Sequence, residues 1–478
     1  MAASVALAEE NENPFHLSHW LGQVDPRPLA LFRIGFGLLL LHDLFDYARD
    51  LPAFLTDSGI APRALLNSAQ WSVFRLSGAP GPIMVLFALT VVVTVAFTLG
   101  LFTRAATVAT WVMVTSLHQR NPFVIDGGDA LARIFLFWSM FTDLAGCWSL
   151  DSLMSRKSGP VRAIGARLLR YHLAALYAVT AWQKFCHGRG ESDWIQGDAI
   201  FKALQLRGFV RPLGEMLAAH PSLCALLTHL VFFLEASFAL FALSPVAIKW
   251  ARAGAILADV GVQLGILFTM RVGIFTELTL WAGVLYLQPE WLDALERGLR
   301  SGRAAATSSA AWAVRRLPRA SATEAGFAIL LWGQFALVDL SWVRRLPQPQ
   351  IAERERLFLG LEQPWDLFGK TNSIIEWKAP GVREDGSPVE VLAIAAPGLL
   401  AKVGTRFSRW YIFEEPDRHV HYEPLALFLC EAFAAQEIGR SRLHSFKLVR
   451  QVQLPRGRGE RESPLIHETL WEQACPRR

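Results

Sequence analysis

Residues 82–102, PIMVLFALTVVVTVAFTLGLF, form an apolar run that contains no charged side chain. Because a helix needs about 20 apolar residues to cross the hydrocarbon core of a bilayer, this run predicts a transmembrane helix. Comparable runs lie near residues 28–48, 104–119, 129–148, 164–184, 222–243, 248–270, 272–292 and 323–343. The sequence therefore predicts an all-α, polytopic membrane bundle of about nine transmembrane helices.

The composition of the whole chain agrees with a membrane protein. Of its 478 residues, 52% are hydrophobic and only 19% are charged, whereas a typical soluble domain has about 25% charged residues. The formal net charge is a modest +5, and the basic residues lie between the apolar runs. This pattern favours contact with membrane lipid and gives no indication of nucleic-acid binding.

The basic residues also predict the orientation of the bundle. Arg156, Lys157 and Arg162 lie between the fourth and fifth predicted spans, and six arginines in residues 297–319 lie between the eighth and ninth. Both loops fall on the same side, and short loops rich in Lys and Arg face the cytoplasm. We therefore expect a multi-pass protein of the inner (plasma) membrane, with a cytoplasmic N-terminus and a periplasmic or extracellular C-terminal segment.

The last part of the chain has a different pattern. It divides the sequence into a transmembrane domain over residues 1–345 and a small α+β domain outside the membrane over residues 346–478. Asp385-Gly386 lies between two extended stretches and predicts a β-hairpin. The segment YEPLALFLCEAFAAQE predicts a short helix.

Two further predictions concern this C-terminal domain. In the segment FKLVRQVQL, Phe446, Leu448, Val452 and Leu454 are expected on one face of a strand that Arg450 interrupts. The two cysteines of the domain, at positions 430 and 475, would be able to form a disulfide in an oxidising compartment. The sequence alone leaves that pairing open.

Several ionisable residues lie inside predicted spans, where an unpaired charge is costly and often functional. Asp129 and Arg133 are four residues apart, so they share a helical face and either pair or line a polar cavity. Glu235 has no opposite charge within one turn, and Arg33 lies in the first span. Lys184 ends the fifth span, either as an anchor that reaches the headgroups or as a base whose burial favours the neutral amine. No CxxC or HExxH spacing is present, so no metal site is predicted.

Four blocks of sequence carry a family resemblance. They are DPRPLALFRIGFGLLLLHDLFDYARDL (25–51), HQRNPFVIDGGDALARIFLFWSMFTDLAGCWSLD (118–151), YAVTAWQKFCHGRGESDWIQGDAI (177–200) and MRVGIFTELTL (270–280). In this order, the blocks resemble the vitamin K-dependent gamma-carboxylases and their bacterial HTTM-domain relatives. The resemblance implies a polytopic helical bundle with a cytoplasmic N-terminus and a C-terminal domain across the membrane.

The resemblance also implies a chemistry. In the carboxylases, a lysine deprotonates vitamin K hydroquinone, and oxidation by oxygen yields a strong base that removes a proton from a peptide glutamate before carbon dioxide adds. Lys184 matches that lysine, in a block where a Trp, here Trp194, follows it. Asp129, Arg133, Glu235 and Trp194 are then expected to shape the cavity around the base.

Two positions depart from the carboxylases: Gly127-Gly128-Asp129 stands where they carry Asn-Asn-His, and Gln263 replaces an expected histidine. The leading prediction is lysine-initiated oxidation of a lipid quinol, with vitamin K hydroquinone or menaquinol as cofactor. This oxidation would be coupled to carboxylation or another modification of an exported protein or peptide. The alternative is a non-catalytic lipid-binding or maturation scaffold for exported proteins. A transporter is less favoured, because the sequence shows no repeated halves.

Overall fold

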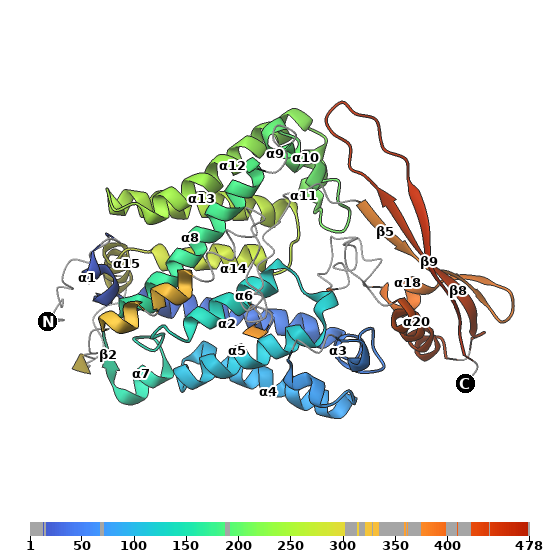
Figure 1. Ribbon diagram of the computed structural model, residues 1–478, viewed down its shortest axis with the longest axis horizontal. Helices are drawn as coiled ribbons and strands as arrows, with labels where there is room; N and C mark the ends of the chain where they lie inside the picture. Colours follow the sequence, from blue (N-terminus) through green and yellow to red (C-terminus); the bar gives the residue numbers. More distant parts are fainter. Residues whose placement is uncertain are drawn as a thin grey trace.

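The computed structural model describes residues 13, 16–66, 71–186, 192–301, 313–314, 321–326, 328–333, 358–359, 361, 374–397, 409, 422–438 and 440–476. Within these residues the protein is mostly helical, with a β-sheet region near its C-terminus. Figure 1 shows the helices packed as a bundle, with the sheet beside one end of it.

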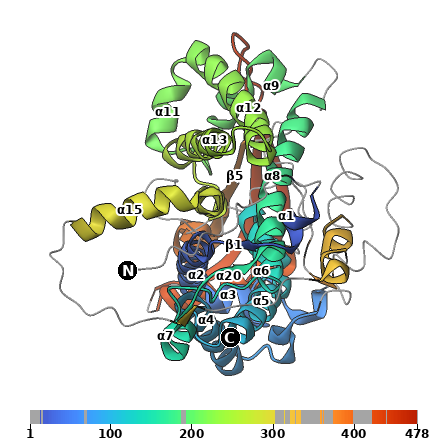
Figure 2. The same ribbon diagram turned by 90° about the vertical axis from the view of Figure 1, so that its left-hand side faces the viewer.

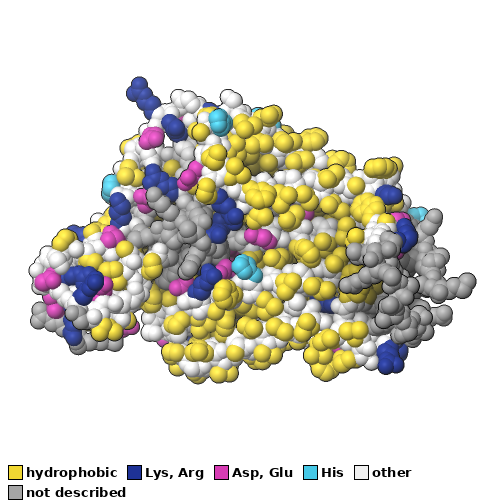
Figure 3. All heavy atoms as spheres, turned by 180° about the vertical axis from the view of Figure 1, so that it is seen from behind, with side chains coloured by type: hydrophobic (Ala, Val, Ile, Leu, Met, Phe, Trp, Pro, Cys, Tyr) yellow, Lys and Arg dark blue, Asp and Glu magenta, His cyan; other side chains and the backbone are white. Residues whose placement is uncertain are grey.

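Long apolar helices form the outer part of the bundle. Among the described residues, four helices are long and apolar enough to cross a membrane: α2 (Pro26–Arg49), α4 (Pro80–Leu99), α12 (Pro221–Leu243) and α13 (Ile248–Thr269). Val85, Phe233 and Leu257 are among their large exposed side chains, and Figure 3 shows apolar side chains over a broad area of the bundle. So large an exposed apolar area is unusual for a soluble protein. The chain is therefore a membrane protein.

The predicted count of nine spans is not confirmed. Helices α5 (Thr103–Arg120) and α8 (Ala163–Cys186) are 18 and 24 residues long, but they are not among these four helices. Helices α6 (Gly127–Ser139) and α14 (Phe275–Ala282) have 13 and 8 residues. At 1.5 Å per residue they extend only about 20 and 12 Å, too short to cross a bilayer. The ninth predicted span, residues 323–343, lies partly outside the described residues.

The overcount has a physical cause. Leu131, Phe135 and Leu278 are fully buried, because neighbouring helices pack against α6 and α14. An apolar run that is buried in protein has the same composition as one that faces lipid, so a sequence window does not distinguish the two.

Helix α8 runs through the middle of the bundle. It packs against α12 and α6, between the α12–α13 pair and the group formed by α2, α4, α5 and α6 (Figures 1 and 2). The remaining elements of this part are α1 (Leu17–Leu21), β1 (Gln23–Val24), α3 (Leu51–Leu55), α7 (Leu150–Ser155), β2 (Lys157–Ser158), β3 (Val161–Arg162), α9 (Asp193–Gln196), α10 (Ala199–Ala203), α11 (Pro212–Ala218), η4 (Gly283–Tyr286), α15 (Pro289–Ser301) and β4 (Ala313–Val314), with short 3-10 turns at Arg63–Leu65, Val73–Leu76 and Pro122–Val124.

Arg33 shows how the bundle accommodates an isolated charge. Its side chain in α2 is fully buried and donates to the backbone carbonyls of Thr98 (3.3 Å), Leu144 (2.5 Å) and Trp148. These carbonyls belong to the end of α4 and to the segment between α6 and α7. Arg33 therefore donates hydrogen bonds to buried carbonyl oxygens that water does not reach. These bonds link α2 to both segments.

The C-terminal sheet is built around one long strand, β8 (Leu443–Gln453). Strand β9 (Ile466–Ala474) pairs with it on one edge, while β5 (Ile374–Lys378) and β6 (Pro380–Arg383) share the other edge; all three pairings are antiparallel. Strand β7 (Pro388–Glu390) pairs with β6, and Gly386 takes a left-handed conformation (φ 82°) in the turn between them. The predicted hairpin at Asp385-Gly386 is thus confirmed.

The predicted face of β8 is present only in its first half. Phe446 and Leu448 are buried, as expected, but beyond them Gln451 is buried and Val452 is only partly buried. The pairing with β9 also becomes irregular between Leu448 and Val449, where Leu470 of β9 is the extra residue of a bulge. The predicted helix is confirmed as α20 (Tyr422–Gln436), which contacts the short helix α18 (Val391–Ala395).

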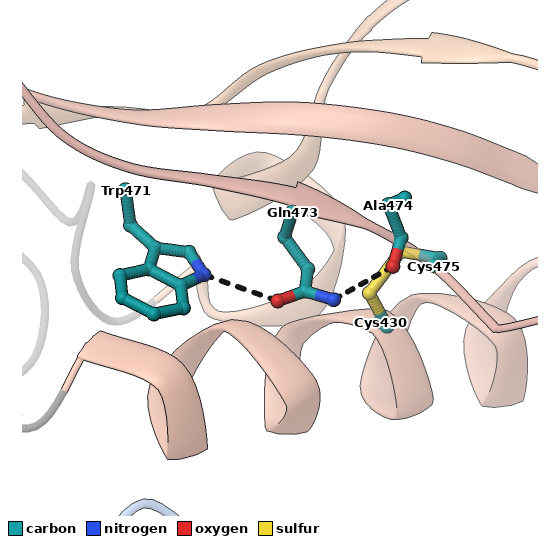
Figure 4. Close-up of a disulfide and its surroundings, with 5 residues drawn as sticks. All are labelled: Cys430, Trp471, Gln473, Ala474 and Cys475. Atoms are coloured by element: carbon teal, nitrogen blue, oxygen red, sulfur yellow. Dashed lines mark hydrogen bonds between the residues drawn. A yellow bond between two sulfur atoms is a disulfide. The ribbon is translucent and has the colours of Figure 1, made fainter.

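A disulfide joins α20 to the end of the sheet. Cys430 and Cys475 are bonded, with their Cα atoms 5.6 Å apart and a sequence separation of 45. Figure 4 shows the bond beside a short chain of hydrogen bonds, in which Trp471 Nε1 donates to Gln473 Oε1 and Gln473 Nε2 donates to the carbonyl of Ala474. The pairing that the sequence left open is therefore present.

Replacement of Cys430 by Ser is expected to destabilise the C-terminal region by about 2–5 kcal/mol, because the crosslink restricts the unfolded chain over a long loop. The measurement is thermal denaturation of the purified protein, with and without reductant. Cys224→Ala is the matched control, since Cys224 is a free buried cysteine, and reductant should still lower the melting temperature of that variant. Equal melting temperatures for wild type with and without reductant would contradict the bond.

Candidate active site

Lys184 and Glu235 form a buried ion pair between α8 and α12. The Nζ atom of Lys184 lies 2.5 Å from both carboxylate oxygens of Glu235. The two residues are only 5% and 6% exposed. The indole of Trp194 covers the ammonium, with Nζ 4.0 Å from the ring centroid, in cation–π geometry. Lys184 is therefore held inside the protein and does not extend to the surface.

Ser192 links Trp194 to Lys184 and positions the indole beside the ammonium. Ser192 N-caps α9: its Oγ accepts from the backbone N–H of Trp194 at 3.3 Å and donates to the carbonyl of Lys184 at 2.8 Å. A serine at this position satisfies the unpaired donors of a helix start. Lys202 then pairs with Asp193 at 2.6 Å, which holds α9 against α10.

A small cavity of about 40 Å³ lies beside the ion pair. Its wall combines apolar and polar side chains: Leu176, Tyr177, Thr180, Lys184, Glu235, Gln263, Ile266, Val272, Phe275 and Thr279. Tyr177 is two helical turns from Lys184 on α8, so both face the cavity. The site therefore offers a buried ion pair, hydroxyl groups and an amide around one space.

Behind the cavity wall, α8 and α13 share a chain of hydrogen bonds. The hydroxyl of Tyr177 donates to Asp259 Oδ1 at 2.5 Å, and Gln263 Nε2 donates to the Tyr177 oxygen at 2.7 Å. Phe238 stacks on the Tyr177 ring with centroids 4.1 Å apart and fixes its position. Among the described residues, Gln263 Oε1 and Asp259 Oδ2 are buried without a hydrogen-bond partner.

A second buried cluster joins the C-terminal region to the bundle. Arg409 binds Asp129 of α6 in a bidentate manner, at 2.7 and 3.0 Å, and also bonds Asp43 of α2 and the carbonyl of Val124. Its guanidinium lies 3.8 Å from the ring centroid of Tyr47. A planar guanidinium matches a carboxylate in this paired geometry.

Charge balance explains why this cluster is stable. Burial alone would lower the pKa of Arg409, but the carboxylates of Asp129 and Asp43 outweigh burial and hold that pKa well above its ordinary value. His118 of α5 completes the cluster: its Nε2 lies 3.2 Å from Asp129, and its Nδ1 lies 3.3 Å from Arg133 Nη1.

The same residues bear on the question of a metal. Asp43, His118 and Asp129 place one ligand atom each within 4.8 Å of one another, and carboxylate and imidazole are ligands that divalent metals accept. However, Arg409 already lies between the two carboxylates. Its guanidinium supplies the positive charge that a metal would bring, so a metal ion would have to displace it.

Two glycines bring α6 and α14 into close backbone contact. A Cβ at Gly128 would lie 2.7 Å from the backbone nitrogen of Phe275, and a Cβ at Gly273 would lie 1.9 Å from Asp126 Oδ2. Gly273 also has φ +64°. Asp126 caps α6 in a reciprocal capping box with Asp129. The Gly-Gly-Asp block and the Arg-Val-Gly-Ile-Phe block of the sequence therefore meet in space.

The structure distributes the predicted site residues over two places. Glu235 and Trp194 surround Lys184, whereas Asp129 and Arg133 belong to the Arg409 cluster and are not among the described residues that line the cavity. Sequence reasoning did not single out Arg409, which is 280 residues from Asp129. It also did not show that Tyr177, Asp259 and Gln263 meet, because helix packing brings them together. One feature of the sequence did point to this hydrogen-bond chain: Asp259 is a charged residue inside an apolar run.

Comparisons with known proteins identify one family. The family model described as the HTTM domain matches residues 22–291, which include α2, both glycine-containing blocks, Lys184 and Glu235. No curated protein matches the chain, and no solved structure matches it.

Replacement of Arg409 by Met is expected to destabilise the protein by about 3–5 kcal/mol, because Asp43 and Asp129 would remain buried without their cation. The measurement is the thermal denaturation temperature of the protein in lipid nanodiscs. In the double variant Arg409→Met/Asp129→Asn the loss should be smaller than the sum of the two single losses, as expected for residues in contact. Strict additivity would contradict the pairing.

Replacement of Gly273 by Ala is expected to cost about 1–3 kcal/mol, because a left-handed backbone is strained for Ala and the new methyl group would collide with Asp126. Gly265→Ala on α13 is the control, since a Cβ there meets nothing within 4 Å and Ala favours the helix. Similar melting temperatures for the two variants would contradict the close approach of α6 and α14.

Proposed function

The chain belongs to the HTTM domain family, and on that premise we propose that it is a membrane enzyme whose Lys184–Glu235 pair deprotonates a reduced lipid quinone. The HTTM domain occurs in vitamin K-dependent carboxylase-like membrane proteins. The observation that carries the proposal is the buried ion pair at the cavity, with Nζ of Lys184 2.5 Å from both oxygens of Glu235. A buried charge pair away from the surface is costly to maintain and is a common feature of functional sites.

The pair acts as a single base. A hydroxyl group that approaches Lys184 gives its proton to Nζ as Nζ passes one to Glu235, so Glu235 becomes a neutral acid. Lys184 then remains an ammonium opposite the newly formed quinol anion. In the low dielectric of the bundle this arrangement stabilises the anion, because the two opposite charges are close and no water screens them.

Trp194 fits the same role. Its ring lies against the ammonium, so it excludes water from one side of Lys184 and stabilises the ammonium, which is present before and after the transfer.

The size of the cavity sets a condition on this reaction. Its volume of about 40 Å³ is close to the roughly 30 Å³ that one water occupies in the liquid. A hydroxyl group fits this space, but a naphthoquinol ring enters only when the wall side chains move apart. In this proposal, wall side chains such as Ile266 and Phe275 move to make that room, since α8 itself is packed against α6 and α12.

We place the modification of an exported protein or peptide at the same end of the bundle. The loop between β8 and β9 docks there: Arg458 binds Asp198 and the carbonyl of Gln196, and Arg456 exchanges two hydrogen bonds with Gln205. The disulfide of this region favours an oxidising compartment, which supports a periplasmic or extracellular position for the C-terminal region in a plasma-membrane protein.

The experiment measures epoxide formation from vitamin K hydroquinone and from menaquinol, with oxygen, by the purified protein in lipid nanodiscs. Wild type should form epoxide, and Lys184→Ala and Glu235→Gln should reduce the rate by at least about 100-fold, the usual contribution of a general base. Lys184→Arg is the matched variant: it keeps the ion pair, but a guanidinium does not lose its proton, so its rate should fall equally.

Lys447→Ala controls for loss of a lysine–carboxylate pair, since Lys447 pairs with Glu472 on the exposed surface, and its rate should equal that of wild type. Full activity of Lys184→Arg would exclude Lys184 as the base. Equal background from wild type and Lys184→Ala would exclude quinol oxidation at this pair and favour the scaffold function.

A further inference from the structure

The hydrogen-bond chain behind the cavity has a fixed direction. Asp259 Oδ1 accepts the proton of the Tyr177 hydroxyl, so only lone pairs of the Tyr177 oxygen remain available to other groups. Gln263 must therefore present its NH₂ group to Tyr177, and the structure shows this bond at 2.7 Å. The carboxyl group of Asp259 thus determines which way the amide of Gln263 faces.

This direction leaves one acceptor at the cavity wall. Gln263 lines the cavity, is 3% exposed, and its Oε1 has no hydrogen-bond partner among the described residues. A buried carbonyl oxygen without a donor is unfavourable by about 1–3 kcal/mol. The site is therefore incomplete until a molecule in the cavity donates a hydrogen bond to Gln263.

The chemistry of the two quinone forms differs in this respect. A quinol carries O–H groups that donate, whereas the oxidised quinone carries only C=O groups that accept. Against Gln263 Oε1 the quinol gains a hydrogen bond, while the quinone places two acceptors face to face.

We propose that the Asp259–Tyr177–Gln263 chain makes the cavity selective for the reduced, hydroxyl-bearing form of its ligand. This inference rests on the proposed function, because it takes the ligand of the Lys184 cavity to be a quinol. Gln263 Oε1 accepts a hydrogen bond from the hydroxyl group of the ligand. Tyr177 and Asp259 are positioning residues that hold the Gln263 amide in one orientation. Oxidation removes the O–H group that donates to Gln263, so the oxidised product binds the cavity more weakly and dissociates.

The test measures binding without turnover. Radiolabelled menadiol and menadione are equilibrated, without oxygen, with the full-length protein in lipid nanodiscs, and the two dissociation constants are compared. Menadiol should bind wild type at least about tenfold more tightly than menadione, the effect of one hydrogen bond gained against one acceptor left unpaired.

Three variants separate the parts of the chain. Gln263→Met removes the acceptor at similar volume, so menadiol binding should weaken to the level of menadione. Asp259→Asn can donate to Tyr177, which frees the Gln263 amide to turn, and the ratio of the two constants should fall toward one. Tyr177→Phe cuts the chain and should have the same effect. Ser237→Ala, a buried hydroxyl of α12 that bonds only its own helix backbone at Phe233, should leave the ratio unchanged.

The outcomes distinguish this inference from the proposed function. Equal binding of both forms by wild type, lost in Lys184→Ala, would overturn the redox selectivity and leave the quinol site in place. An unchanged ratio in Asp259→Asn with a lost ratio in Gln263→Met would overturn the positioning role of Asp259. Absence of saturable binding of either form would overturn both proposals.

Discussion

Inside an apolar bundle, no water is present to solvate a charge, so each charged side chain requires a partner within the protein. Lys184 and Glu235 meet this constraint between α8 and α12. Arg409 meets it by joining a residue far along the chain to α2 and α6, and Arg33 meets it with backbone carbonyls. The position of the central helices, and of the C-terminal region against them, follows from where these charges are neutralised.

The two ionic clusters have different consequences. In the Arg409 cluster, the guanidinium binds two carboxylates, and Tyr47 and His118 stack beside it. The Lys184–Glu235 pair borders a cavity, so its charge can respond to a ligand. We therefore propose chemistry at the Lys184–Glu235 pair, which borders a cavity, and a structural role for the Arg409 cluster, whose cation already binds two carboxylates.

Sequence patterns predicted several of the helices and the hairpin correctly, but they did not predict the contacts of the candidate site. Apolar runs located α2, α4, α12 and α13, and the Asp385-Gly386 turn signal located the hairpin. Helix α20 was also predicted, because local sequence determines these elements. The apolar runs gave too many transmembrane spans, because α6 and α14 are apolar helices that are buried within the protein and are too short to cross the membrane. Lys184 and Glu235 were each singled out, but no pattern showed that they meet. Arg409 gave no signal, since a contact over 280 residues is set by tertiary packing.

In the proposed reaction, the Lys184–Glu235 pair receives the hydroxyl group of a lipid quinol. An electron cryo-microscopy structure of the protein in nanodiscs, prepared without oxygen in the presence of a reduced naphthoquinol, tests this directly. We expect a ring in an enlarged cavity, with one hydroxyl group within hydrogen-bond distance of Lys184 Nζ. A quinol bound elsewhere, with Lys184 and Glu235 still in direct contact around a cavity of unchanged size, would contradict it.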